Sequence, residues 1–208
     1  MSDQGRGTLI VLSGPSGVGK STVISSLLAR RPDIYFSVSF TTRPPRAGEV
    51  NGVNYHFVSR QEFERMIAAD ELLEYAEYVG NYYGTSRTVI EHALAEGTDV
   101  LLDIEVQGAA RVREQFPGAV LAFLAPPSME ALAHRLRSRS TDDEATIARR
   151  LCRAAEECEK IGLYQFLVVN DKVTHAVEEL EAILRAESCR VCNRKAVLER
   201  LVQTCGQA

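Results

Sequence analysis

Short apolar runs alternate with amphipathic segments along most of the chain. The runs cover residues 8–12, 99–104, 119–125 and 166–169, and each is followed by residues whose apolar side chains recur at helical spacing. Continuous apolar runs of this length are typical of strands that are buried on both faces. Strands that alternate with helices predict an α/β fold, in which helices flank a parallel sheet and the crossover connections are right-handed.

Residues 35–87 break this rhythm. They contain two adjacent prolines and several glycines, and residues 53–58 alternate like a half-exposed antiparallel strand. Ser59 and Glu62 form a capping-box signature that predicts a short helix. The sequence therefore predicts a small α+β lobe inserted into the parallel domain.

The composition is that of a globular protein. Of 208 residues, 45% are hydrophobic and 25% are charged, which excludes a disordered or fibrous chain. The net charge of −4 argues against a nucleic acid or an anionic membrane as a dedicated partner. The sequence has no run of roughly 20 apolar residues that could span a membrane, and its first apolar run is too short for a signal peptide. We therefore expect a cytoplasmic protein.

A complete phosphate-binding motif, G-x-x-x-x-G-K-S, follows the first predicted strand. Its glycines let successive backbone N–H groups point at phosphate oxygens, and the next helix presents the positive end of its dipole. Lys20 is expected to reach the β- and γ-phosphates of ATP, and the Ser21 hydroxyl is expected to bind Mg²⁺. The alternative is a chance glycine-rich turn. The predicted ATP-binding residues of this segment are Gly14, Pro15, Ser16, Gly17, Val18, Gly19, Lys20, Ser21 and Thr22.

Charged residues elsewhere suggest two further parts of a site. Asp103 ends an apolar run, where a carboxylate can act on the metal through water or, alternatively, cap the next helix. Arg43 and Arg46 lie three apart on a proline-stiffened loop and suit bidentate recognition of a second phosphate. Taken alone, the two arginines would more often be solvated surface charges.

The sequence strongly resembles the guanylate kinase family, of bacterial type, among the nucleoside monophosphate kinases with a phosphate loop. The resemblance runs from about residue 9 to residue 184. It comprises the phosphate loop, T-T-R-P-P-R-A-G-E-x-N-G-x-x-Y, G-N-Y-Y-G-T, L-D-I-E-V-Q-G, A-P-P-S and V-V-N-D.

The resemblance implies residue roles as well as a fold. It implies that the acceptor GMP is bound by Ser39, Arg43, Arg46, Tyr55, Glu74, Tyr83, Thr85 and Glu105. Among these, the arginines and tyrosines would hold the phosphate, while Ser39, Glu74 and Thr85 would read the base. Asn170 would lie near the adenine of ATP. The implied catalytic residues are Lys20, Arg46, Arg135, Arg139 and Arg150.

The base assignment also makes chemical sense. Guanine presents N1–H and its 2-amino group as adjacent donors, and a carboxylate such as that of Glu74 accepts both; adenine lacks this pair. Two positions depart from the family's usual pattern. Thr85 stands where serine is frequent and keeps the hydroxyl, and Glu105 stands where aspartate is common.

The implied reaction transfers the γ-phosphoryl group of ATP to GMP, giving ADP and GDP, with Mg²⁺ as cofactor. Two alternatives are a kinase for another small phosphate monoester and a non-catalytic binding module. The implied organisation is a single domain at residues 1–187. Its core covers residues 1–38 and 88–187, its GMP-binding lobe residues 39–87 approximately, and its helical lid residues 137–150 approximately.

Residues 188–208 form an extension beyond the family's usual end. Val197, Leu198, Leu201 and Val202 recur at helical spacing, so we expect this tail to pack on the domain or on a partner subunit of a homo-oligomer. Its cysteines, at positions 189, 192 and 205, have no histidine close in sequence. Ordinary thiols are therefore a better interpretation than a zinc site.

Overall fold

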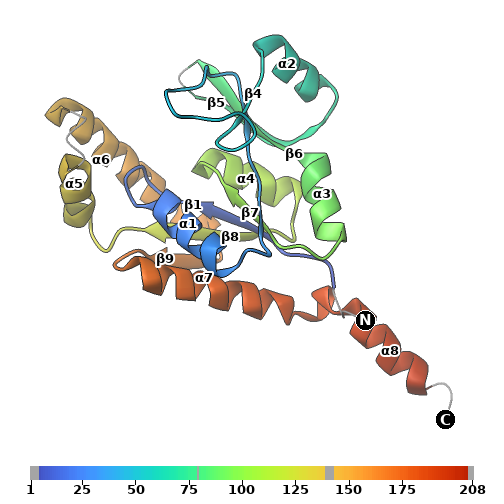
Figure 1. The fold of residues 1–208 in the computed structure, drawn as a ribbon. Helices are drawn as coiled ribbons and strands as arrows, with labels where there is room; N and C mark the ends of the chain where they lie inside the picture. Colours follow the sequence, from blue (N-terminus) through green and yellow to red (C-terminus); the bar gives the residue numbers. More distant parts are fainter. Residues whose placement is uncertain (1–4, 79, 139–142, 206–208) are drawn as a thin grey trace.

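The computed structural model describes residues 5–78, 80–138 and 143–205. Five strands form one sheet in which every pairing is parallel, in the order β2-β7-β1-β8-β9 (Figure 1). These strands are β1 (Leu9–Ser13), β2 (Tyr35–Phe36), β7 (Val100–Asp103), β8 (Val120–Ala125) and β9 (Phe166–Val169). The parallel sheet confirms the predicted α/β class.

Helices cover both faces of this sheet. One face packs against α1 (Lys20–Arg30) and α7 (Val173–Ser188), and the other against α3 (Arg87–Ala95) and α4 (Val106–Gln115). Strand β1 explains the continuous apolar run, because Ile10 and Leu12 enter the first core while Leu9 and Val11 enter the second.

The inserted lobe has a second sheet, in the order β4-β3-β6-β5. Its elements are β3 (Phe40–Thr41), β4 (His56–Phe57), α2 (Arg60–Ala68), β5 (Leu72–Tyr78) and β6 (Asn81–Ser86). Phe63, Met66 and Leu72 form its small core. The predicted cap of α2 is confirmed, since the Glu62 N–H donates to Ser59 Oγ at 3.1 Å.

The prediction of an antiparallel strand at residues 53–58 is wrong. Only His56 and Phe57 form a strand there, and they pair parallel to β3. The preceding residues are held in a turn, because Asn54 Oδ1 accepts from the Val50 N–H at 2.8 Å and Asn51 Oδ1 accepts from the Phe57 N–H at 2.8 Å. Asparagine side chains that bond nearby backbone compete with a strand ladder.

Helices α5 (Met129–Ser138) and α6 (Glu144–Cys158) form a hairpin beside the sheet (Figure 1). Leu132, Leu136, Ile147 and Ala154 give this hairpin a core of its own. The lid predicted at residues 137–150 covers the end of α5 and the first half of α6, and its residues 139–142 lie outside the described residues. A short 3₁₀ turn, η1 (Ile161–Leu163), then leads to β9.

The C-terminal extension consists of η2 (Val191–Asn193) and α8 (Lys195–Cys205), and α8 points away from the domain (Figure 1). Leu198, Leu201 and Val202 are 49%, 63% and 64% exposed, so these side chains do not pack on the domain. Contact with a partner subunit stays a prediction. No helix in the described ranges is both long and apolar enough to cross a membrane.

Cys152, Cys158, Cys189 and Cys192 carry free thiols. Among the described residues, no three His, Cys, Asp or Glu side chains gather closely enough to hold a metal ion. The interpretation of the tail cysteines as ordinary thiols stays a prediction.

Leu27→Ala should lower the free energy of unfolding by about 2–5 kcal/mol, because Leu27 of α1 is fully buried in the core that α1 shares with α7. The matched variant Leu201→Ala should cost less than about 0.5 kcal/mol at low protein concentration, where no second subunit covers this exposed side chain. Urea unfolding of both variants tests this difference. A loss at Leu201 that grows with protein concentration would instead show that a second subunit covers α8.

Candidate active site

The phosphate loop joins β1 to α1 at the carboxyl edge of the sheet. Gly17 and Gly19 have φ values of 89° and 99°, which favour glycine. A Cβ on Gly17 would also lie 2.6 Å from Leu136 Cδ2 of the hairpin. Lys20 begins α1, and its Nζ donates to the Gly14 carbonyl at 2.7 Å. The lysine therefore lies folded over the loop that contains it.

Two side chains donate hydrogen bonds to the backbone carbonyl of Val18, on the outer side of this loop. Asn170 Nδ2 donates to it at 2.7 Å and Arg135 Nη1 at 3.0 Å. Arg135 Nη2 also donates to the Asn170 carbonyl at 2.7 Å. These groups line a cavity of about 300 Å³ together with Gly19 and Thr22. The predicted Asn170 and Arg135 therefore lie together, on the side of the loop where α1 begins.

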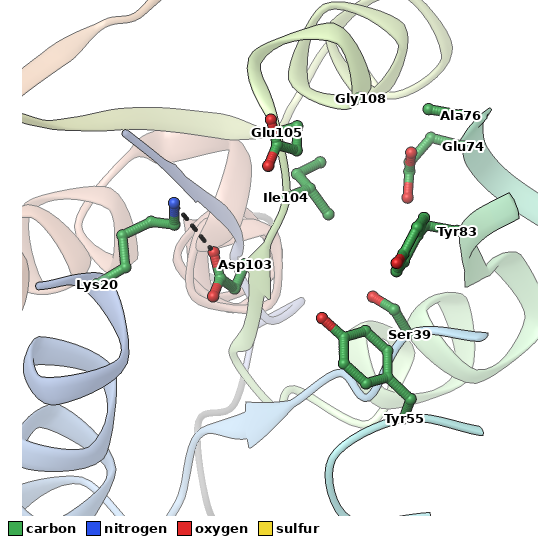
Figure 2. A pocket seen from close by; sticks show the side chains of 10 residues that line it. All are labelled: Lys20, Ser39, Tyr55, Glu74, Ala76, Tyr83, Asp103, Ile104, Glu105 and Gly108. Carbon is green, nitrogen blue, oxygen red and sulfur yellow. Dashed lines mark ion pairs between the residues drawn. The ribbon is translucent and has the colours of Figure 1, made fainter. Parts of the chain in front are cut away.

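Asp103 lies at the carboxyl end of β7, which is the strand next to β1. Its Oδ1 is 3.9 Å from Lys20 Nζ (Figure 2). Burial raises the pKa of Asp103, while the charge of Lys20 opposes this rise. Adjacent parallel strands thus bring one lysine and one carboxylate to the same edge of the sheet, as the sequence predicted.

A cavity of about 200 Å³ extends from this pair to the inserted lobe (Figure 2). The parallel domain contributes one wall and the lobe the other. Its lining residues are Lys20, Asp103, Ile104, Glu105 and Gly108 from the domain, and Ser39, Tyr55, Glu74, Ala76 and Tyr83 from the lobe. Sequence reasoning missed Ala76, Ile104 and Gly108, because small and apolar residues carry no chemical signal of a site.

Glu74 is a buried carboxylate at the far end of this cavity and is 5% exposed. It lies opposite Thr85 across strands β5 and β6, and Thr85 Oγ1 donates to its Oε1 at 2.6 Å. Burial raises the pKa of Glu74, and the Thr85 bond and the charge of Arg111 partly oppose the rise. Two of the three predicted base-reading residues are therefore in direct contact.

Arg43, Tyr55 and Tyr83 lie together on the lobe. The Arg43 guanidinium lies 5.4 Å from the centroid of the Tyr55 ring, whose edge meets Tyr83 at a centroid distance of 5.9 Å. Arg43 Nη2 also pairs with Glu49 Oε1 at 2.8 Å. Glu49 was not assigned a role from the sequence, although its fixed spacing from Arg43 is part of the recognised motif.

Arg46 is less closely integrated into this group. Its side chain is exposed, and its backbone N–H donates to Glu49 Oε2 at 2.7 Å. Glu49 therefore ties both ends of the arginine loop, while only Arg43 stacks near the tyrosines.

Glu105 lines the same cavity from the parallel domain and is paired with the hairpin. Glu105 Oε2 pairs with Arg153 Nη2 of α6 at 2.8 Å, a partner that sequence reasoning missed. Arg150 is half-buried in the first half of α6. Arg139 lies outside the described residues.

The fold and loop define a P-loop nucleotide-binding protein, and the comparisons identify its family. The guanylate kinase family model matches residues 6–187. A guanylate kinase of Synechococcus sp. (strain JA-3-3Ab) is 54% identical, covering 86% of this chain and 82% of its own. One of Symbiobacterium thermophilum is 52% identical, covering 98% and 97%. The crystal structure of guanylate kinase from Anaplasma phagocytophilum has a TM-score of 0.76 at 37% identity, covering 91% and 90%. The chain belongs to the guanylate kinase family.

Glu74→Gln should stabilise the fold at neutral pH. Because the pKa of Glu74 is raised, the folded protein holds this proton more tightly than the unfolded chain. The contribution of Glu74 to wild-type stability therefore falls as pH rises from about 4.5, the ordinary value, through the folded pKa. Urea unfolding from about pH 4 to pH 8 should show an advantage of the glutamine variant that grows with pH.

Glu62→Gln is the matched control, because the hydrogen bond from Arg65 lowers the pKa of this exposed carboxyl. Its effect should have the opposite sign: the stability of Glu62→Gln relative to the wild type should fall as pH rises. A constant difference between wild type and Glu74→Gln over this pH range would contradict the raised pKa.

Proposed function

We propose that this protein transfers the γ-phosphoryl group of ATP to GMP, giving ADP and GDP. One observation carries the proposal: a single cavity has the phosphate-loop lysine at one end and the buried carboxylate of Glu74 at the other. Family membership supports the same reaction. A donor phosphate and an acceptor base would thus be bound at opposite ends of one cavity.

Glu74 reads the acceptor base by accepting hydrogen bonds from N1–H and the 2-amino group of guanine. Adenine offers no such pair, so it would leave a buried carboxylate unsatisfied. Ser39 and Thr85 supply hydroxyls to the same base. Arg43, Tyr55 and Tyr83 hold the acceptor phosphate, and Arg46 joins them from its exposed loop.

The donor nucleotide is bound by the loop amides and by Lys20. The Lys20 amine already lies over the loop, where it donates to the Gly14 carbonyl. Asn170 and Arg135 border the cavity beside Gly19 and Thr22, which suits the nucleoside part of ATP. Arg139 and Arg150 add positive charge from the hairpin, where negative charge develops during transfer.

Ser21 and Asp103 suit Mg²⁺, because a hydroxyl and a carboxylate are hard oxygen donors. Ser21 follows Lys20 in the first turn of α1, and Asp103 lies 3.9 Å from the Lys20 amine. When bound with ATP, the ion would neutralise phosphate charge. In this proposal Ser21 is a direct ligand and Asp103 acts through water.

Catalysis by this site requires no general base, since the second pKa of a phosphate monoester is about 6 and the acceptor is mostly an anion near neutral pH. The residues instead bring two polyanions together and exclude water. Closure of the lobe, at residues 39–87 approximately, and of the lid, at residues 137–150 approximately, achieves both.

The proposal covers organisation and location as well. Residues 1–187 form the kinase domain, and residues 188–208 form an extension that contacts a second subunit. The free thiols of the described cysteines favour a reducing compartment, and we place the activity in the cytoplasm.

The acceptor test is ADP release from ATP and Mg²⁺ with GMP, AMP, UMP, CMP or dTMP added separately. GMP alone should support release. Glu74→Ala should lower kcat/KM for GMP by at least about 100-fold, since two hydrogen bonds to a charged group are lost. Glu77→Ala, an exposed glutamate on the same strand, is the control. Equal release with several acceptors would indicate another monophosphate kinase, and no release would indicate a binding module.

Lys20→Ala should lower kcat by about 100- to 1,000-fold, because a preorganised electrostatic contact to the transferring group is removed. Lys195→Ala, on the exposed α8, should leave kcat unchanged. Single-turnover kinetics with saturating ATP and GMP separate this effect from binding. A Lys20→Ala enzyme with the wild-type rate would rule out the assigned role.

A further inference from the structure

Gly108 occupies the first turn of α4 although nothing in its backbone requires a glycine. It does not have the positive φ of the loop glycines. Glycine within a helix is less favourable than alanine, because it loses more backbone entropy on folding. The reason for glycine at this position must therefore be the space that a side chain would occupy.

That space belongs to Glu74. A Cβ on Gly108 would lie 2.8 Å from Glu74 Oε2 and 3.3 Å from its Cδ, whereas the next neighbour, Ile104 Cδ1, would be in ordinary contact at 3.5 Å. Figure 2 shows α4 with Gly108 beside the Glu74 carboxylate at the end of the cavity. Glu74 is buried, and its other oxygen is bound by Thr85 at 2.6 Å. The carboxylate therefore cannot move away from α4 without disturbing that bond.

The order of groups on guanine indicates which one lies next to Gly108. Along the edge that faces a carboxylate, O6 comes first, then N1–H, then the 2-amino group. The single proton of the Thr85 hydroxyl is donated to Oε1, so Oε1 has one acceptor position fewer than Oε2. N1–H can use the remaining position of Oε1, and the 2-amino group, which brings two N–H donors, then falls beside Oε2, where Gly108 presents no side chain.

We propose that Gly108 is a specificity-determining position, whose missing side chain leaves Glu74 Oε2 unobstructed, so that this oxygen accepts from the 2-amino group of the acceptor base. This inference rests on the proposed function. It adds that discrimination of the base depends on the surface of α4 as well as on the carboxylate itself.

The test compares GMP with IMP, which has the same N1–H and O6 but lacks the 2-amino group. Wild-type turnover of GMP comes first, because its absence would refute the proposed function rather than this inference. Gly108→Ala should lower kcat/KM for GMP by about 10- to 100-fold, the range expected for one hydrogen bond to a charged group. IMP should lose at least tenfold less. Equal losses for both acceptors, or no loss, would overturn the proposal.

A mutant cycle with Glu74→Ala keeps the test independent of IMP turnover. In that background, Gly108→Ala should change kcat/KM for GMP by less than about threefold, because the clash no longer exists. A full loss in both backgrounds would contradict the proposal.

The Cβ would meet the tip of a side chain rather than backbone, so Gly108→Ala should fold and bind ATP normally. Gly162→Ala, with no atom within 4 Å of its Cβ, is the control. Should Gly108→Ala unfold, the double variant with Glu74→Ala must recover the fold, and failure to do so would overturn the inference.

Discussion

The carboxylate of Glu74 is held away from water between the lobe and α4, and much of the site is arranged around it. Burial of an ionised group is unfavourable unless hydrogen bonds and charges compensate. Thr85 supplies one bond at 2.6 Å, and Arg111 supplies a favourable charge, yet the pKa remains raised. A ligand that offers two adjacent donors completes this compensation. In the proposed function, the same desolvation that destabilises the empty site therefore favours a guanine base over its competitors.

The location of Glu74 follows from the fact that the two sheets position different parts of the site. The parallel sheet ends at the phosphate loop and Asp103, so it fixes the donor side at its carboxyl edge. The lobe packs its own sheet around Phe63, and its antiparallel pair β5–β6 fixes Glu74 opposite Thr85. Neither unit encloses the cavity alone. In the proposed function, an acceptor bound to the lobe therefore faces the phosphate loop across the cavity that both units line.

The sequence predicted most of what depends on local pattern. The burial of Leu9 and Ile10 on opposite faces of the sheet and the phosphate loop follow from runs and motifs. The resemblance grouped Glu74 with Thr85, but their direct hydrogen bond is a finding of the structure. The parallel pairing of His56 and Phe57 did not, because two residues carry too little periodicity to reveal a partner. The pairing of Glu105 with Arg153 also escaped prediction, since it joins residues 48 positions apart through the packing of α6.

The hairpin and the phosphate loop are linked by groups that sequence reasoning assigned to the nucleotides themselves. Arg135 comes from α5 and Asn170 follows β9, yet both donate to the carbonyl of Val18. Leu136 of the same helix lies so close to Gly17 that a Cβ there would collide with it. Because the Arg135 side chain of the hairpin is bonded to the backbone of the loop, a displacement of α5 must either carry the loop with it or break these hydrogen bonds. Residues expected to act only on the substrates therefore also determine the shape of the loop that binds them.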